Sequence, residues 1–258
     1  MTRILLTNDD GVTAPGLLAL ATALRAVNFD VTVLAPDRNW SASGHVKTLH
    51  RPLRVSPALL ADGSPAWKSD GAPSDCVALA LMGALEGDFD YVVSGINPNA
   101  NIGLDVTYSG TVTAAMEGSI GGKPSFAVSL DAPEYHQGPL DFESAAMAAA
   151  RIIQHLIQEG QNTNPAPIWN INVPYRPAGD FAGEIYTRQG VRLYRDMLEK
   201  RLDPRGKPYY WIGGEAPTGV VEEGTDFGAL SQGYISITPL TMDMTDFPRL
   251  DALRSGGS

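Results

Sequence analysis

The feature that most constrains the fold is the start of the chain, where a strand-like run, an acidic turn and a helix follow one another. Residues 3–7 form a short apolar run of strand length, which ends at a polar cluster at residues 8–11 (NDDG). After Pro15, leucines and alanines recur at helical spacing. This order is typical of the first unit of an α/β fold, in which ligands bind at the carboxyl ends of parallel strands.

The two adjacent aspartates of this turn are the first candidates for a functional site. Asp9 and Asp10 cannot both point into an apolar core, and neighbouring carboxylates repel each other unless a cation joins them. A divalent ion such as Mg²⁺, Mn²⁺ or Ca²⁺ would remove the repulsion, because these hard cations prefer oxygen ligands. The alternative is a solvated turn that caps the following helix, since Asp and Asn favour both positions.

The composition favours one large α/β domain and argues against a surface that binds polyanions. The chain has 258 residues, 43% of them hydrophobic and 19% charged, so it can bury a sizeable core. A net charge of −10, with no Lys/Arg run longer than two residues, argues against coating nucleic acid or an anionic membrane. A small phosphorylated substrate stays compatible, because a bound metal can supply positive charge locally.

Cysteine usage and apolar run length indicate an intracellular setting. The single cysteine, Cys76, lies in an apolar run, so we expect a core residue rather than a nucleophile. No apolar run reaches the length of a membrane span, and the first residues enter a strand with no signal-peptide pattern. We therefore expect a cytoplasmic protein.

Three later segments place further polar side chains beside predicted strands or helices. A buried strand at residues 30–35 precedes a loop at 36–45 (PDRNWSASGH), and a strand at 89–94 precedes an Asn-rich loop that includes residues 97–101. Residues 109–111 (SGT) begin a helix and offer hydroxyls and free N–H groups to an anion. Because parallel strands deliver their loops to one edge, we expect a shared site. The alternative for each segment is an ordinary polar turn or helix cap.

The rest of the chain continues the α/β alternation and then loses it. The pattern predicts strands at residues 124–130 and 168–173, helices at 73–85 and 141–158, and a small antiparallel excursion of 47–55 with 66–69 around a turn at Asp62-Gly63. Later strands are predicted at residues 183–188 and 209–213 outside the main sheet, another at 234–238, and a terminal helix at 246–254.

Taken together, NDDG, APDRNWSASGH, VSGIN and YSGTVTAAMEG resemble motifs of the stationary-phase survival protein SurE family. The similarity continues through GAPSDCVALAL, NINVP, YYWIGG and TDFGALSQGYISITPL and so covers nearly the whole chain. It implies a divalent-metal-dependent 5'/3'-nucleotidase, a phosphoric monoester hydrolase acting on nucleoside monophosphates. The implied metal ligands are Asp9, Asp10, Ser41 and Asn97, with Asp9 and Asp10 also catalytic. The residues implied around the phosphate are Asn8, Ser43, Gly44, His45, Ser109, Gly110 and Thr111.

The resemblance also implies an architecture and an assembly. It implies a single domain over residues 1–258, a three-layer α/β sandwich with a mostly parallel, Rossmann-like sheet. The core would span about 1–180, and residues from about 181 to 258 would form an extended hairpin and helix that join a homodimer or homotetramer by segment exchange. One ion per subunit is implied, with Mg²⁺ or Mn²⁺ favoured and Ca²⁺ an alternative.

The sequence departs from the family after the SGIN motif and leaves the mechanism open. Pro98 and Asn99 stand where members commonly carry a variable residue and then Gly. We favour in-line attack by water, with an aspartate as general base or orienter. The alternatives are a covalent phosphoryl-Asp9 intermediate and a non-catalytic protein that binds or senses nucleotides.

Overall fold

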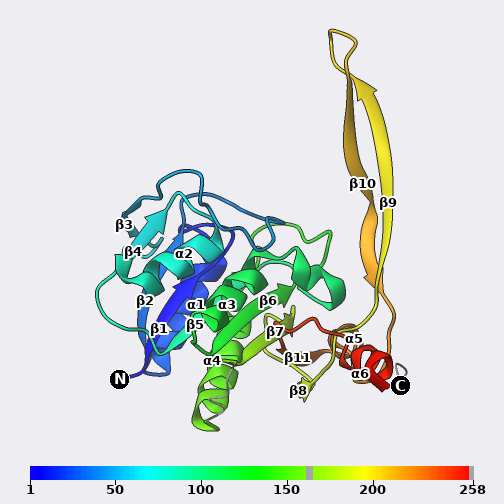
Figure 1. The fold of residues 1–258 in the computed structure, drawn as a ribbon. Helices are drawn as coiled ribbons and strands as arrows, with labels where there is room; N and C mark the ends of the chain where they lie inside the picture. The colour runs from blue at the N-terminus through cyan, green and yellow to red at the C-terminus, as the bar shows by residue number, and fades with distance from the viewer. Residues whose placement is uncertain (161–164, 256–258) are drawn as a thin grey trace.

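The fold is a nine-stranded sheet between two layers of helices, with a long two-stranded arm that projects from the body (Figure 1). The computed structural model describes residues 1–160 and 165–255. The strand order is β3-β4-β2-β1-β5-β6-β7-β11-β8. Its strands are β1 (Arg3–Thr7), β2 (Asp30–Pro36), β3 (Val55–Leu59), β4 (Pro65–Ser69), β5 (Tyr91–Asn97), β6 (Ser125–Asp131), β7 (Ile168–Pro174), β8 (Gly183–Tyr186) and β11 (Tyr234–Leu240).

The helices cover both faces of the sheet. They are α1 (Pro15–Ala26), α2 (Pro73–Leu79), α3 (Gly110–Ile120), α4 (Glu143–Gln158) and α5 (Asp226–Ser231), with a π-helical turn η1 (Ala80–Ala84) and a 3₁₀ turn η2 (Gly103–Thr107). A last helix, α6 (Phe247–Ser255), buries none of its residues. Alternate residues of β1 serve the two faces: Ile4 and Leu6 pack in the core under α1 and α4, whereas Leu5 packs under α2 and α3. Cys76 is fully buried in this second core, as predicted.

The centre of the sheet is parallel, which confirms the predicted α/β class and its layers. β1 pairs in parallel with β2 and β5, and β6 pairs in parallel with β5 and β7. The carboxyl ends of these strands therefore meet at one edge, and the loops that follow them are brought together there. In the described part of the chain, none of the helices combines the length and hydropathy needed to cross a bilayer.

The antiparallel excursion begins later than predicted. β3 starts at Val55, and residues 47–54 pair with no strand, so the predicted strand at 47–55 is wrong. The side chains of this segment are held by polar partners elsewhere: Lys47 reaches Glu117 and Thr48 reaches Asp75. Those contacts direct the backbone away from a sheet edge, whereas the predicted turn near residue 63 joins β3 and β4.

The strands after residue 181 are also placed differently from the prediction. The segment at 183–188 was expected outside the main sheet, but β8 is the edge strand of that sheet. β11 lies between β7 and β8, antiparallel to the first and parallel to the second. The run at 234–238 is therefore interior. Only β9 (Arg192–Leu202) and β10 (Pro208–Gly219) form the separate two-stranded arm.

Candidate active site

The acidic turn after β1 is held in shape by its own first residue. The side-chain Nδ2 of Asn8 donates to the Gly11 carbonyl oxygen at 3.1 Å, and the Gly11 N–H donates to Asn8 Oδ1 at 3.2 Å. The backbone N–H of Trp40 donates to the Asp9 carbonyl oxygen at 2.7 Å, which ties this turn to the loop after β2. Asn8 is fully buried, so it shapes the loop that presents Asp9.

Asp9 lies against the N-terminus of α3. The Thr111 hydroxyl donates to Asp9 Oδ1 at 2.6 Å, and only 3% of Asp9 is exposed. Gly110 makes this approach possible, because a Cβ atom at that position would lie 2.7 Å from the Cβ of Asp9. The positive end of the helix dipole favours a negative group at this point.

The two aspartates hold their protons more tightly than usual. Burial raises the pKa of Asp9, and the hydrogen bond from the Thr111 hydroxyl opposes that rise. Burial, followed by the neighbouring charge of Asp9, raises the pKa of Asp10 to about 6, against a hydrogen bond from Asn39 to Asp10 Oδ1 at 3.0 Å. A cation bound beside this pair would favour the ionised form of both carboxylates.

A cavity of about 280 Å³ opens beside Asp9 and gathers several predicted site residues. Ser41 comes from the loop after β2, Asn97 ends β5, and Ser109 caps α3 by accepting from the Val112 N–H. The lining residues are Asp9, Ser41, Ala42, Asn97, Asn99, Ala100, Asn101, Asp105, Tyr108, Ser109 and Arg192. The structure therefore unites three of the four predicted ligand residues around one space.

The remaining predicted residues lie around this cavity rather than in its lining. Asp10 accepts from Asn39 outside it. His45 Nε2 is 2.9 Å from Glu117 Oε2, and the hydrogen bond from His45 is the first cause of the lowered pKa of Glu117. The Gly44 N–H donates to the Tyr108 carbonyl oxygen at 3.0 Å. The SASGH loop is thus fastened to the segment that begins α3.

Two residues of the loop after β2, Ala42 and Ser43, are unusual in conformation or environment. The Ser43 Oγ atom is buried and has no hydrogen-bond partner in the described part of the structure. Ala42 has a φ of 56°, a left-handed conformation that non-glycine residues rarely adopt. Strained or unsatisfied groups of this kind concentrate at binding sites, so they support this loop as part of the site.

The donor chemistry suits a hard cation that uses neutral oxygen ligands beside carboxylates. Within the described residues, no three His, Cys, Asp or Glu side chains gather closely enough to hold a metal by themselves. The Asn97 Nδ2 group donates to the Asn99 carbonyl oxygen at 2.5 Å, so its Oδ1 atom is the group that can bind a cation. Together with Asp9 and the Ser41 hydroxyl, it offers the oxygen ligands that Mg²⁺ and Mn²⁺ prefer.

Sequence reasoning missed the residues that come from the foot of the arm. Arg192, the first residue of β9, lines the cavity, and its Nε atom lies 2.6 Å from Asp105 Oδ2. The Tyr194 hydroxyl donates to Asp105 Oδ1 at 2.5 Å. Arg192 and Asp105 are 87 residues apart in the chain, and no local motif connects them.

Comparison with known proteins identifies the family of the chain. The family model described as survival protein SurE matches residues 4–196. A 5'-nucleotidase SurE from Herpetosiphon aurantiacus is 53% identical over 244 residues, covering 95% of this chain and 94% of the relative. The chain belongs to the SurE family. The resemblance found in the sequence motifs is thereby confirmed.

Further SurE proteins agree in sequence and in fold. A 5'-nucleotidase SurE from Chloroflexus aggregans is 49% identical and covers 97% of both chains. The crystal structure of the SurE protein from Aquifex aeolicus superposes with a TM-score of 0.79 at 37% identity, covering 99% of this chain and all of the other. Both sequence relatives are named 5'-nucleotidases, in agreement with the phosphoric monoester hydrolase expected from the sequence.

Proposed function

We propose that this SurE protein is a divalent-metal-dependent phosphatase that hydrolyses nucleoside monophosphates to nucleoside and phosphate. The observation that carries the proposal is the position of Asp9, buried at the N-terminus of α3 and lining a cavity with Ser41, Asn97 and Ser109. The names of the relatives support the substrate class. The oxygen atoms that Asp9, Ser41 and Asn97 offer around one cavity support a bound cation as the group that completes the site.

The phosphate is held by the start of α3. An anion at this point is favoured by the dipole of an 11-residue helix. The Ser109 Oγ atom accepts from the Val112 N–H, so its hydroxyl hydrogen remains able to donate to a phosphate oxygen. The Thr111 hydroxyl donates to Asp9 instead, so its part in the site is to fix the carboxylate.

Asp9 acts on the attacking water. When bound, Mg²⁺ or Mn²⁺ neutralises phosphoryl oxygens and lowers the pKa of water. Asp9, with the side-chain oxygens of Ser41 and Asn97, would hold that ion. Asp10 would be a further ligand or would orient the other ligands. The Asp9 carboxylate accepts a proton from water aligned opposite the leaving oxygen, and the hydrogen bond from the Thr111 hydroxyl fixes the carboxylate for that transfer.

The proposal is tested by phosphate release from adenosine 5'-monophosphate. Protein stripped with chelator should release no phosphate, and activity should return when Mn²⁺ or Mg²⁺ is added in excess. Full turnover in excess chelator would contradict metal dependence. A stripped and reloaded protein that releases no phosphate from any nucleoside monophosphate would instead favour a binding or sensing protein.

The covalent alternative has its own test. If Asp9 accepted the phosphoryl group, rapid acid quench with radiolabelled substrate would trap phosphate on the protein, and the label would map to Asp9. Direct attack by water predicts no labelled protein at any time during the first turnover. It also predicts inversion of configuration at a chiral phosphorus, whereas a covalent intermediate predicts retention.

The assembly is proposed to be a dimer or tetramer formed through the arm and the terminal helix. On β9 and β10, Met197, Trp211 and Ile212 are at least 60% exposed. α6 buries none of its residues against the body. Exposed apolar strands invite pairing with another chain, and a closed symmetric dimer is the commonest result. A chain cut before Asp246 should show a lower molar mass in light scattering than the full chain at matched concentration.

A further inference from the structure

A second and larger cavity lies next to the one that contains Asp9. Its volume is about 550 Å³, within the usual range for small-molecule sites. The two cavities share Asn99, Ala100 and Arg192 in their linings. The larger one is built where β6 ends at Asp131 and β7 ends at Pro174, so it continues along the ligand-binding edge of the parallel sheet.

The lining of the larger cavity combines an aromatic face with hydrogen-bonding groups. Phe227 is half-buried, and Tyr175 packs edge-on against His136 with ring centroids 5.1 Å apart. Asp131 is partly buried, and burial raises its pKa while the charge of Arg192 opposes the rise. An aromatic ring suits the flat face of a base, and a carboxylate accepts hydrogen bonds from sugar hydroxyls.

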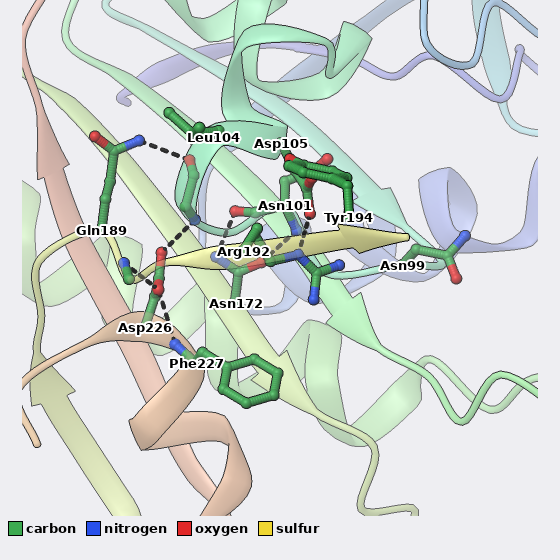
Figure 2. Close-up of polar contacts among 12 residues, drawn as sticks. Asn99, Asn101, Leu104, Asp105, Asn172, Gln189, Arg192, Tyr194, Asp226 and Phe227 are labelled. Carbon is green, nitrogen blue, oxygen red and sulfur yellow. Dashed lines mark hydrogen bonds and ion pairs between the residues drawn. The ribbon is translucent and has the colours of Figure 1, made fainter. Parts of the chain in front are cut away.

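The wall between the two cavities is fixed before any ligand binds. Figure 2 shows Arg192 and Tyr194 converging on Asp105, at 2.6 Å and 2.5 Å. It also shows the buried Asp226 carboxylate beside Phe227. That carboxylate accepts from the N–H groups of Gly103 and Phe227 at 2.8 Å each. These bonds hold the 3₁₀ turn, the foot of the arm and α5 in one arrangement, so Phe227 and Arg192 are pre-positioned.

We propose that the 550 Å³ cavity binds the nucleoside half of the substrate, with Phe227 against the base and Asp131 accepting a hydrogen bond from a ribose hydroxyl. The inference rests on the proposed function, since it takes the phosphate to be bound beside Asp9. Arg192 stands at the junction, between the phosphate and the nucleoside. The cavity thereby sets a preference for nucleoside monophosphates over simple phosphate esters.

The Asp131 contact is tested by removing one hydroxyl from the substrate. Wild-type protein loaded with Mn²⁺ should have a kcat/KM for adenosine 5'-monophosphate about tenfold above that for its 2'-deoxy or its 3'-deoxy form, whichever lacks the bonded hydroxyl. In Asp131→Ala this preference should fall to within about twofold. Asp180→Ala, which changes an exposed aspartate outside the cavity, should keep the wild-type ratio.

The Phe227 contact is tested by removing the base. Phe227→Leu should lower kcat/KM for adenosine 5'-monophosphate about tenfold, mainly through KM, because the ring face is lost. With ribose 5-phosphate, which has no base, the same variant should match wild type within about twofold. The ratio of kcat/KM for the two substrates is taken within each protein and then compared between proteins, so a variant that folds in lower yield still gives an answer.

The outcomes separate this inference from the proposed function. If wild type hydrolyses neither adenosine 5'-monophosphate nor ribose 5-phosphate, the proposed function fails. If it hydrolyses them but Asp131→Ala keeps the hydroxyl preference and Phe227→Leu changes both substrates equally, the nucleoside lies elsewhere and the inference is overturned. Selective losses in both variants support it.

Discussion

At the scale of single residues, the site depends on two carboxylates that are costly to ionise. Asp9 is almost fully buried, and Asp10 lies beside it with a pKa of about 6 instead of 3.8. In the metal-free protein, ionised Asp9 and Asp10 therefore lower the free energy of unfolding, and a bound cation would remove that loss. The pair should be most stable either protonated or bound to a metal.

The first prediction concerns stability against pH in metal-free protein. Because the folded state raises the pKa of Asp10, its contribution is fully present below pH 4 and is lost as the pH rises to about 6. The free energy of unfolding should fall by roughly 1–2 kcal/mol over that window, after discounting for solvent screening. Urea unfolding in chelator at a series of pH values measures it. The decline should be smaller in Asp10→Asn, and equal declines in both proteins would contradict the assignment.

The second prediction concerns the hydroxyl that fixes Asp9. Thr111→Val keeps the shape but removes the donor to Asp9 Oδ1, which leaves a buried carboxylate oxygen without that bond. We expect kcat/KM to fall by an amount equal to a loss of about 1.5–3 kcal/mol of transition-state stabilisation, because the bond is to a charged group. Thr111→Ser retains the hydroxyl and should recover most of the activity. Equal activity in the two variants would show that the hydroxyl has no part in positioning Asp9.

At the scale of elements, Asp226 joins three segments that are distant in sequence. Its carboxylate accepts from the N–H groups of Gly103, Gly190 and Phe227, all at 2.8 Å, and the residue is fully buried. The 3₁₀ turn at the rim of the Asp9 cavity, the segment before β9 and the start of α5 are therefore locked together. The geometry of both cavities follows from this junction.

The third prediction is that Asp226→Ala is strongly destabilising. It leaves the buried N–H group of Gly103 and the partly buried N–H groups of Gly190 and Phe227 without their acceptor. The loss is about 1–3 kcal/mol for the buried group and less for each of the other two, so we expect a total of about 3 kcal/mol. Asp203→Ala is a matched control. Asp203 also accepts two backbone N–H groups, but in the exposed turn of the arm, so its loss should cost under about 1 kcal/mol. If denaturant unfolding showed the same loss of unfolding free energy in Asp226→Ala and Asp203→Ala, the stabilising role of Asp226 would be contradicted.

The elements that could be predicted are those whose signals are local. β1 was predicted with its observed bounds, and Asp9 was proposed as a site residue because an acidic pair follows the first strand. The insertion of β11 between β7 and β8 was missed, because strand order is decided by packing of the whole sheet. The Asp105–Arg192 pair was missed for the same reason: it exists only once the arm returns to the body.

At the scale of the whole molecule, the two-stranded arm extends away from the body of the chain. Figure 1 shows β9 and β10 extending far from the sheet, with α6 beside the foot of the arm. The arm begins at Arg192, which also lines the Asp9 cavity. Contacts that hold the arm in an assembly would therefore also steady one wall of the site.

The fourth prediction tests the arm as a contact surface. Ile212 on β10 is 82% exposed, so Ile212→Lys should leave the fold of the single chain intact and weaken the proposed oligomer. Met82→Lys changes a residue that is 72% exposed on the body and serves as the control. Light scattering should show a lower mass for the first variant only. A full-length wild type that is monomeric at micromolar concentration and fully active would contradict the assembly.

The central claim is that Asp9 is the carboxylate on which phosphate hydrolysis depends, and one comparison tests it most directly. Release of phosphate from adenosine 5'-monophosphate should be measured with saturating Mn²⁺ for wild type, Asp9→Asn and Asp37→Asn, the last changing an exposed aspartate of the neighbouring loop. We expect Asp9→Asn to fold and to lose turnover by at least a thousandfold, since it loses a charged oxygen ligand and the proton acceptor. Asp37→Asn should stay within about twofold of wild type. Turnover by Asp9→Asn at the wild-type rate would contradict the account.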